Sequence, residues 1–366
     1  MSKPTVLILF GGKSTEYEVS LISAHSILTN IDREKYTVVT VGITKGGDWY
    51  LYGGDIDCMK NGTWCTDTSA LKRAALSPSP ADSGIYVFGA DGSAELVHID
   101  VIFPVMHGAN AEDGTLQGLM QLSGIPFVGS GCATSAIGMD KAYTKLVVSH
   151  YEIPQAKCDI INSFRLASDP DSVVKACEDI GKYPLFVKPA NAGSSVGASK
   201  ANDRTELMSA LTLAAEHDSK IIVEEYIKGK EVEVAVMGNR PMGQDAYTAS
   251  TPGQINPGAE FYDYDAKYSA DSNSSAIIPA DIGEDTAKKV REYAKIICGA
   301  LGVTGLSRVD FFVYEKDGEE KIIFNEINTL PGFTQISMYP KLFMHDGMTY
   351  PEIIDKLIAL ALKKEA

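Results

Sequence analysis

A lysine at the end of an apolar segment precedes a loop rich in glycine and serine. The segment Leu185 to Lys188 is followed by Gly193, Ser194, Ser195 and Gly197. A lysine cation, serine hydroxyls and the backbone N–H groups that glycine leaves accessible can together bind a polyphosphate. An exposed β-turn with a solvated lysine would show the same residues. The loop therefore indicates a phosphate site only if other groups of suitable chemistry accompany it.

Two short sequences with alternating polar residues supply such groups. In Arg308-Val309-Asp310 and in Glu326-Ile327-Asn328 the outer side chains lie two residues apart, so on a strand they point to one face. Asp310, Glu326 and Asn328 offer only oxygen ligands, the set that magnesium prefers when it also holds phosphate oxygens. Solvated acids at strand ends are the alternative for each sequence alone. Together with the lysine and its loop, they favour a site for a nucleotide and its metal ions.

The overall composition narrows the class of protein. The 366 residues carry a formal net charge of -15, which disfavours nucleic acid as a partner because such binding needs a basic face. Near the N-terminus the only apolar run, Thr5 to Phe10, is too short for a signal peptide or a membrane span. We therefore expect a cytoplasmic protein without a membrane partner. The six cysteines are scattered without metal-site spacing, and we expect reduced thiols.

The first of three predicted units, residues 1–138, has strands that are apolar on both faces. Its elements are a strand over Val6 to Phe10, a turn at Gly11-Gly12, a helix over Val19 to Leu28, and strands over Val38 to Ile43 and Val101 to Met106. Such strands are typical of a parallel sheet covered by helices. Residues 53–92 are predicted as loops and short helices, with a β-hairpin around Ile85 to Leu96.

Two further units are predicted, over residues 139–228 and 229–366, and each combines strands with helices. The first contains a helix from Pro170, the strand Leu185 to Lys188, a helix over Arg204 to His217 and the strand Ile221 to Glu225. The second contains the strands Glu231 to Met237, Val309 to Tyr314 and Lys321 to Asn325, the long helix Glu284 to Ala300 and a last helix over Pro351 to Lys364. Residues 251–275 are polar with little periodicity, which predicts a mobile loop over a site.

Taken in this order, these sequences resemble the D-alanine–D-alanine ligase family of the ATP-grasp superfamily. The resemblance covers nearly the whole chain and rests on Phe10 to Ser20, His107-Gly108, Glu112 to Thr115, Met139 to Lys141, Gly193 to Gly197, Phe261 to Tyr264, Lys267-Tyr268 and Asn325 to Phe333. It implies a fold class of α/β and α+β type. An N-terminal Rossmann-like domain with a parallel sheet, 1–138, would precede the two modules of an ATP-grasp fold, a central lid module 139–228 and a catalytic module 229–366.

The resemblance implies a site for ATP and two Mg²⁺ ions, with Mn²⁺ as an alternative metal. The residues implied in nucleotide binding are Lys141, Lys188, Ser194, Ser195, Glu224, Glu225, Ile227, Glu231, Lys267 and Asn325. Lys141 and Lys188 would hold phosphates, residues 224–227 would line the adenine pocket, and Glu231 would bind the ribose. The metal ligands would be Asp310, Glu326 and Asn328. The sequence leaves a monovalent cation open.

Further roles are implied at the two amino acid substrates, carried by Glu16, His107, Ser194, Tyr268, Arg308, Gly332, Ser337 and Met338. Glu16 would bind the ammonium of the first D-alanine, and Ser194 and Tyr268 would connect it to the long loop, which then acts as a lid. His107 would lie near the first carboxylate, although a core histidine with satisfied hydrogen bonds is the alternative. Arg308 and the Gly332 backbone would face the oxyanion. Ser337 and Met338 would bind the second carboxylate.

The implied activity is ATP-dependent ligation of two D-alanines to D-alanyl-D-alanine, a bacterial peptidoglycan precursor. A carboxylate reacts with an amine only after phosphorylation makes one oxygen a leaving group, and the acylphosphate must be kept from water. Three alternatives stay open: a D-alanine–D-serine or D-lactate ligase, an ATP-grasp ligase for another acid, and an inactive nucleotide-binding regulator. The stretches around Trp49 and Trp64 resemble the D-serine-using members, and Gln335 stands where the family often has a small residue, which leaves the geometry of the second subsite open. The resemblance also implies a homodimer.

Overall fold

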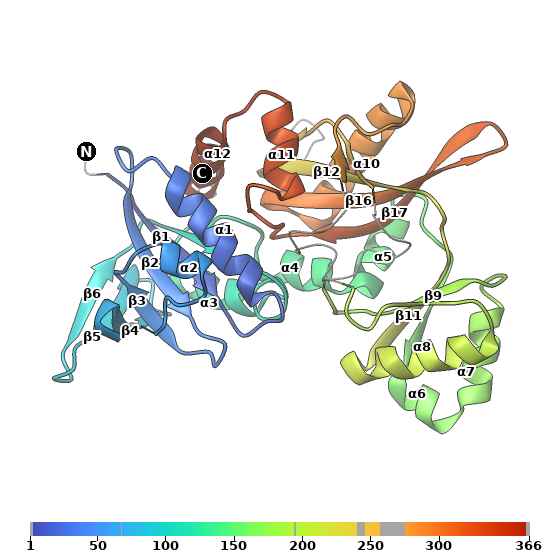
Figure 1. The fold of residues 1–366 in the computed structure, drawn as a ribbon, viewed down its shortest axis with the longest axis horizontal. Helices are drawn as coiled ribbons and strands as arrows, with labels where there is room; N and C mark the ends of the chain where they lie inside the picture. The colour runs from blue at the N-terminus through green and yellow to red at the C-terminus, as the bar shows by residue number, and fades with distance from the viewer. Residues whose placement is uncertain (1–2, 67, 194, 240–245, 257–274, 364–366) are drawn as a thin grey trace.

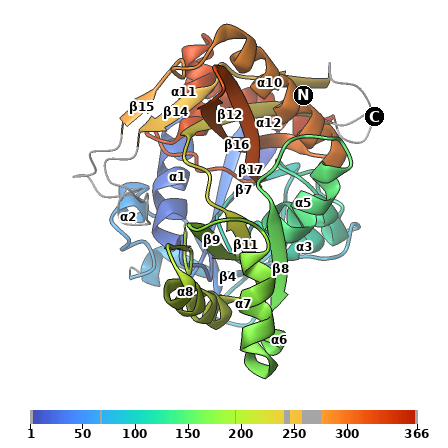
Figure 2. The ribbon, with the colours of Figure 1, turned by 90° about the vertical axis from the view of Figure 1, so that its right-hand side faces the viewer.

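Three sheets follow one another along the chain. The computed structural model describes all residues except 1–2, 67, 194, 240–245, 257–274 and 364–366. Figures 1 and 2 show the four-stranded sheet and its helices below the six-stranded sheet, with the seven-stranded sheet to one side in Figure 1. Among the described residues, no helix is long and apolar enough to cross a membrane.

The first sheet has the strand order β6-β5-β4-β3-β2-β1-β7. Its strands are β1 (Thr5–Gly11), β2 (Thr37–Ile43), β3 (Trp49–Tyr52), β4 (Leu71–Leu76), β5 (Gly84–Phe88), β6 (Ala94–His98) and β7 (Val101–Val105). The predicted parallel pairing is confirmed for β1 with β2 and β7, and the predicted hairpin is confirmed as β5 and β6. The prediction of loops and short helices for the rest of residues 53–92 was wrong for β4, because exposed Lys72 and Arg73 interrupt its apolar pattern.

Helix α1 (Tyr17–Asn30) starts from a glycine turn at the end of β1. Gly11 has φ +84°, and a Cβ atom there would lie 2.2 Å from the Ile43 carbonyl oxygen, so the turn requires glycine. The other helical segments beside this sheet are α2 (Asp57–Lys60), the 3-10 helix Thr68–Ala70 and α3 (Thr115–Ser123). This turn directs the chain between β1 and α1, including Glu16, toward the third sheet's side of the molecule, where the cavity described below lies.

The second sheet has the order β10-β9-β11-β8. Its elements are β8 (Cys158–Asn162), α6 (Ser163–Ser168), α7 (Pro170–Glu178), β9 (Leu185–Pro189), β10 (Ser199–Ala201), α8 (Arg204–His217) and β11 (Lys220–Glu225). Helices α7 and α8 pack a hydrophobic core on the face turned away from the other sheets (Figure 1). On the opposite face Ala142 of α5 (Lys141–Ser149) packs against Ile222 and Ala190. The short helix α4 (Cys132–Met139) leads into α5.

The third sheet has the order β15-β14-β12-β16-β17, and β13 pairs with β12. Its strands are β12 (Lys230–Asn239), β13 (Tyr247–Ala249), β14 (Gly253–Asn256), β15 (Ser275–Ile277), β16 (Thr304–Lys316) and β17 (Glu319–Asn328). The long helix α10 (Glu284–Leu301) packs on one face and ends at Gly302, whose φ is +70°. The predicted loop 251–275 was wrong for β14, and residues 257–274 lie outside the described chain.

The C-terminal helices α11 (Met338–His345) and α12 (Tyr350–Leu362) join the first and third sheets. Residues from β1, α1, β7, β12 and α12 form one hydrophobic core, and Figure 1 shows α12 beside α1. Helix α12 begins with a capping box in which Thr349 and Glu352 satisfy each other's backbone N–H groups. The three sheets fall within the predicted units 1–138, 139–228 and 229–366, although α12 shares the core of the first. The boundaries of these units stay a prediction.

Candidate functional site

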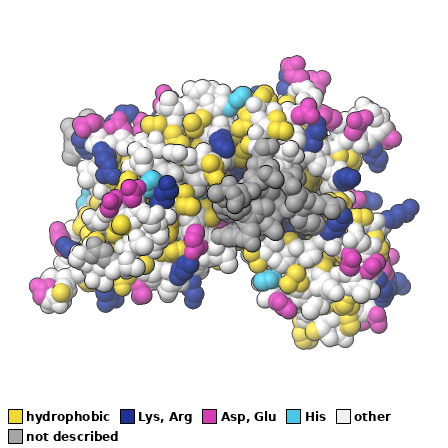
Figure 3. Space-filling model, in the orientation of Figure 1, with side chains coloured by type: hydrophobic (Ala, Val, Ile, Leu, Met, Phe, Trp, Pro, Cys, Tyr) yellow, Lys and Arg dark blue, Asp and Glu magenta, His cyan; other side chains and the backbone are white. Residues whose placement is uncertain are grey.

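A cavity of about 1200 Å³ lies where the three sheets meet. Its lining comes from all three parts of the chain, for example Glu16 and His107 from the first, Lys141 and Lys188 from the second, and Asp310 from the third. This volume is at the upper end of small-molecule sites, as expected for a site that holds more than one substrate. On the outer face shown in Figure 3, the described lysines and arginines are scattered among acidic side chains rather than gathered in a basic patch.

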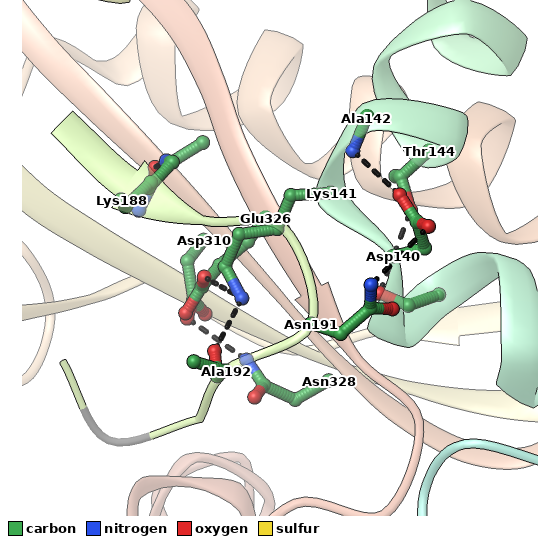
Figure 4. A network of polar contacts seen from close by, with 12 residues as sticks. Asp140, Lys141, Ala142, Thr144, Lys188, Asn191, Ala192, Asp310, Glu326 and Asn328 are labelled. Atoms are coloured by element: carbon green, nitrogen blue, oxygen red, sulfur yellow. Dashed lines mark hydrogen bonds and ion pairs between the residues drawn. The ribbon is translucent and has the colours of Figure 1, made fainter. Parts of the chain in front are cut away.

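Strands β16 and β17 carry the predicted acidic residues on the wall of this cavity. The strands are antiparallel, with Arg308 opposite Asn328 and Asp310 opposite Glu326. All four residues line the cavity. Figure 4 shows Asp310, Glu326 and Asn328 close together on this wall. The period-two alternation in each sequence is therefore confirmed. Because the strands pair directly, the two sequences act as one surface rather than as two separate strand ends.

A β-bulge at Asn325 allows this surface to coexist with a buried core. Asp310 pairs with Glu326, but Phe311 pairs with Phe324, so β17 has one extra residue between them. Without the bulge Phe324 would share the cavity face with Glu326. With it, Phe324 is 1% exposed and packs in the core behind the cavity surface, and Asn325 and Glu326 follow it along the lining. The bulge thus adds the Asn325 amide to the site, where its Oδ1 accepts a hydrogen bond from Lys188 Nζ at 3.3 Å.

Arg308 is held by two carboxylates, and we call Glu233, Arg308 and Asp310 the arginine cluster. Arg308 donates two hydrogen bonds to Asp310, at 2.8 and 2.7 Å, and its Nε lies 3.0 Å from Glu233 Oε2. Burial opposes the charge of Arg308, but Asp310 and Glu233 raise its pKa well above the ordinary value. Asn328 Nδ2 donates to Asp310 at 3.1 Å. The guanidinium is therefore charged and fixed in orientation.

The opposite wall holds a second buried group of charges, and we call Lys145, Lys188 and Glu224 the lysine cluster. Lys145 Nζ lies 2.6 Å from one Glu224 carboxylate oxygen, and Lys188 Nζ lies 2.8 Å from the other. All three side chains are more than nine-tenths buried. Burial disfavours both charges, yet the lysines lower the pKa of Glu224, and Glu224 with Glu326 raises the pKa of Lys188. Glu224 and Lys188 are therefore ionised.

Lys141 reaches across between the two walls. It opens α5, where the Asp140 carboxylate caps the helix by accepting from the backbone N–H groups of Ala142 and Tyr143. Its Nζ donates to the Ala192 carbonyl at 2.9 Å and lies 3.4 Å from Glu326 Oε2 (Figure 4). The loop after Lys188 is thus tied to α5 and faces the acidic strand pair.

Glu16 lies at the end of the cavity nearest the first sheet. Two glycines make room for it: a Cβ atom would come 2.7 Å from Glu16 Oε2 if placed on Gly108, and 3.0 Å if placed on Gly193. His107 also lines the cavity, but its Nε2 contacts Ser23 Oγ at 3.2 Å and its Nδ1 contacts the Leu330 carbonyl oxygen at 3.0 Å. Both ring nitrogens therefore have partners, and burial lowers the pKa of His107.

Comparison with known proteins decides the family. Residues 5–130 match the family described as "D-ala D-ala ligase N-terminus", and residues 147–359 match "D-ala D-ala ligase C-terminus". The D-alanine–D-alanine ligase of Ruminiclostridium cellulolyticum is 48% identical over 373 residues, covering 100% of this chain and 96% of that protein. That of Acetivibrio thermocellus is also 48% identical, covering 99% and 96%. The chain belongs to the D-alanine–D-alanine ligase family.

Solved structures of this family agree with the fold. The VanG D-Ala:D-Ser ligase from Enterococcus faecalis is 39% identical with a TM-score of 0.87, covering 98% of this chain and 100% of that one. The D-alanine–D-alanine ligase from Coxiella burnetii is 30% identical with a TM-score of 0.82, covering 100% and 95%. The ATP-grasp fold class is therefore confirmed. As a member of this family, the protein is an ATP-dependent, ADP-forming ligase that acts on small molecules.

The cavity gathers most of the residues that the family resemblance implied. Those lining it are Glu16, His107, Lys141, Lys188, Ser195, Glu224, Glu225, Ile227, Glu231, Arg308, Asp310, Asn325, Glu326, Asn328, Gly332, Ser337 and Met338. Ser194, Lys267 and Tyr268 lie outside the described residues. At the far end Ser337 Oγ accepts a hydrogen bond from the Thr334 backbone at 3.0 Å, beside Gly332. The roles of all these residues stay predictions.

Among the cavity residues without a predicted role, three charged ones lie close to the groups described above. Glu233 and Lys145 each complete one of the charge clusters, and Glu112 lies near the substrate end, with its Oε1 3.9 Å from His107 Nδ1. Burial, and then the charge of Glu16, raise the pKa of Glu112 to about 8. Lys145 follows Lys141 by one helical turn, and Glu233 follows Glu231 by two strand positions. These spacings place Lys145 on the helix face of Lys141 and Glu233 on the strand face of Glu231, and they were the only signals for Lys145 and Glu233 in the sequence.

The acidic wall suits a divalent metal ion of the hard type. Among the described residues, no three His, Cys, Asp or Glu side chains are grouped as a metal site on their own. Asp310 and Glu326 instead present two adjacent carboxylates, with the amide of Asn328 beside them. Oxygen-only ligands of this number fit Mg²⁺ when phosphate oxygens complete the coordination. The residues present therefore fit the metal that the family requires.

Proposed function

We propose that the protein joins two D-alanine molecules to D-alanyl-D-alanine at the expense of ATP. The observation that carries this proposal is a single cavity with cationic side chains on one wall, oxygen ligands on the other and Glu16 at one end. A phosphate chain and a divalent ion would each find groups of opposite charge. Glu16 supplies a carboxylate for the ammonium of an amino acid. An inactive regulator would not need the metal ligands.

The nucleotide would lie between the second and third sheets. Lys141 and Lys188 would hold phosphate oxygens, with residues 224–227 along the base and Glu231 at the ribose. Mg²⁺ held by Asp310, Glu326 and Asn328 would neutralise charge on the transferring phosphoryl group. Lys141 is suited to follow the phosphates because its flexible side chain already reaches the Ala192 carbonyl and approaches Glu326. Asn325 would support Lys188 through the bulge of β17.

Arg308 and Gly332 would act where charge develops on the substrate. The first D-alanine, bound through its ammonium by Glu16 with His107 nearby, would direct its carboxylate to the phosphoryl donor. When the second amine attacks, negative charge appears on the former carbonyl oxygen, and Arg308 and the Gly332 backbone N–H, both on the cavity lining, would donate to it. Because Arg308 is fixed by two carboxylates, it needs no reorganisation at that moment.

A D-alanine–D-serine ligase is the second candidate, since VanG is among the similar structures. The side chain near the second subsite is Met338, which is apolar and 7% exposed, and this favours a methyl group over a hydroxymethyl group. The Trp64 stretch, which resembled the D-serine-using members of the family, does not support this second candidate. Trp64 is fully buried against Phe10 and donates a hydrogen bond to Tyr17, so it serves the core of the first sheet.

A coupled assay for ADP tests the proposal. The purified protein is given ATP, Mg²⁺ and D-alanine alone, and then with D-serine or D-lactate added, and the products are identified by mass. We expect ADP release with D-alanine alone and D-alanyl-D-alanine as the main product in every mixture. A mixed product in excess would favour the second candidate. No D-alanine-dependent ADP release would reject both. Homodimer formation, a monovalent cation, use of Mn²⁺ and a cytoplasmic location stay predictions.

A further inference from the structure

Lys145 is the buried member of the lysine cluster that the proposed chemistry leaves without a role. Its side chain is 6% exposed and its Nζ lies 2.6 Å from Glu224 Oε1. It follows Lys141 by four residues on α5, so both lysines lie on the same helix face one turn apart. Lys141 reaches toward the acidic wall, whereas Lys145 reaches Glu224. Helix α5 therefore meets the cavity at two places, and only the first faces the proposed phosphate site.

The surroundings of Glu224 suit a flat, partly apolar group. Glu224 lies near the end of β11, and the cavity wall beside it includes the apolar residues Ala156, Phe186 and Ile227. A buried carboxylate among apolar side chains needs hydrogen-bond donors on all sides, because an ionised oxygen without them is costly to bury. Lys145 and Lys188 each bring an ammonium group into ion-pair distance of a different Glu224 oxygen. A carboxylate accepts about four hydrogen bonds in total, so acceptor capacity remains for a ligand.

We infer that Lys145 is a positioning residue that fixes Glu224 as a charged acceptor for an exocyclic amino group, and so makes the proposed nucleotide site prefer adenine to an oxo-purine. The inference rests on the proposed nucleotide site. Two lysines on two different oxygens hold the carboxylate plane in one orientation, which a single lysine would not do. Hypoxanthine carries an oxygen where adenine carries the amino group. It would place an acceptor against an acceptor, and the site would reject it.

Binding of ADP and of inosine diphosphate, measured by titration calorimetry without any amino acid, tests this inference. We expect the unaltered protein to bind ADP at least about tenfold more tightly, the difference typical of one hydrogen bond to a charged group. Lys145→Met should bring the two affinities to within about threefold, mainly by weakening ADP. Equal affinities in the unaltered protein, or an unchanged preference in Lys145→Met, would overturn the inference.

Lys141→Met is the matched control, since it removes the same charge one turn earlier on the same helix. Its partners are Ala192 and Glu326 on the phosphate side, so both diphosphates should weaken equally and the preference should survive. If Lys145→Met does not fold, Lys145→Gln keeps a donor without the charge, and its preference should fall between those of the other two proteins. Loss of preference in the Lys141 variant as well would mean that any change in α5 disturbs the site, which contradicts a specific role for Lys145.

The test separates this inference from the proposed function. If neither diphosphate binds to the unaltered protein, the proposed nucleotide site itself fails. If both bind and ligation of D-alanine is absent, the proposed function fails while the base preference stands or falls by its own measurement. The thermal midpoint without nucleotide is recorded for each variant. A purely structural role would lower that midpoint and weaken both diphosphates alike, leaving the ratio of their affinities unchanged.

Discussion

The two walls of the cavity carry buried charge clusters of opposite composition. The lysine cluster surrounds one carboxylate with two lysines, so it keeps one positive charge in excess. The arginine cluster surrounds one guanidinium with two carboxylates, so it keeps one negative charge in excess. Each cluster fixes its central group by contacts from two sides. The two walls therefore differ in the sign of their excess charge, although both clusters hold one central group between two groups of opposite charge.

The opposite excess charges of the two clusters indicate which ligand each wall can bind. Buried ion pairs often contribute little to stability, because desolvation offsets their attraction. Two clusters with opposite excess charges, facing one cavity, are better explained by ligands than by folding. The positive wall suits a phosphate chain, and the negative wall with Glu326 suits divalent cations.

Removal of the guanidinium should have the largest effect. Arg308→Ala leaves Glu233 and Asp310 together without their cation, and it removes a donor for the developing oxyanion. We expect turnover to fall by about 10² to 10³, as for loss of an oxyanion donor, with ADP affinity changed by less than about threefold. The measurements are steady-state ADP release with D-alanine and titration calorimetry with ADP.

The control for this variant is Arg308→Lys. It keeps the charge between the carboxylates but loses the paired hydrogen bonds of the guanidinium to Asp310. We expect it to bind ADP normally and to recover part of the lost turnover. Undiminished ADP release by Arg308→Ala would remove Arg308 from the reaction and leave the arginine cluster with a structural role alone.

The acidic wall formed by β16 and β17 shows which part of the site the sequence predicted and which part it did not. Alternation in 308–310 and 326–328 predicted the acidic surface, because side chains two apart on a strand share a face whatever the fold. The bulge at Asn325 was not visible, since it depends on the register between two strands. Glu233 and Lys145 were missed for a related reason. Each of these charged residues has its partner on a different element, and the sequence does not say which elements will pack together.

The fold was predictable where a local signal dominates. The helix at Arg204 was predicted with its observed bounds, since Asp203 caps it and apolar residues follow at helical spacing. Strand β4 was missed because its exposed charges interrupt the apolar pattern. The packing of α12 against the first sheet could not be predicted from the sequence, for a different reason. Its apolar face predicts burial but does not say which sheet supplies the partner.

Glu112 differs from the carboxylates of both clusters, because the charge that acts on it most strongly is the negative charge of Glu16. Burial and Glu16 raise its pKa to about 8 in the folded protein, from an ordinary value of 4.5. Between these values the folded state keeps a proton that the unfolded state has lost. The free energy of unfolding should therefore fall as pH rises through this range, by on the order of 2–4 kcal/mol in total.

Glu112→Gln should flatten this pH dependence. The measurement is urea unfolding of both proteins between about pH 6.5 and 8.5. In that range the pKa of His107, which burial lowers, leaves the ring neutral in the folded state, so His107 contributes little. The unaltered protein should lose more free energy of unfolding with rising pH than the variant. Parallel slopes would show that Glu112 is ionised and that the end of the cavity nearest the first sheet carries two negative charges, on Glu16 and Glu112.

The smallest expected effect concerns the contacts that hold the loop of the positive wall. Asn191 joins this loop to the body: its Nδ2 donates to Asp218 at 2.9 Å and approaches Asp140 Oδ2, the cap of α5, at 3.4 Å. Asn191→Ala should loosen Ala192, and with it the position of Lys141 (Figure 4). We expect the KM for ATP to rise about threefold to fivefold, with the free energy of unfolding changed by less than about 1 kcal/mol.

Asn202→Ala is the matched control, because Asn202 Nδ2 also donates to a carboxylate, that of Glu206, at the exposed connection between β10 and α8. It should cost a similar free energy of unfolding and leave the KM for ATP unchanged. If both variants raise the KM equally, general loosening of the second sheet is the cause. If only Asn191→Ala does, the positive wall depends on its loop being fixed to α5, whereas the negative wall is fixed by the strand pair itself.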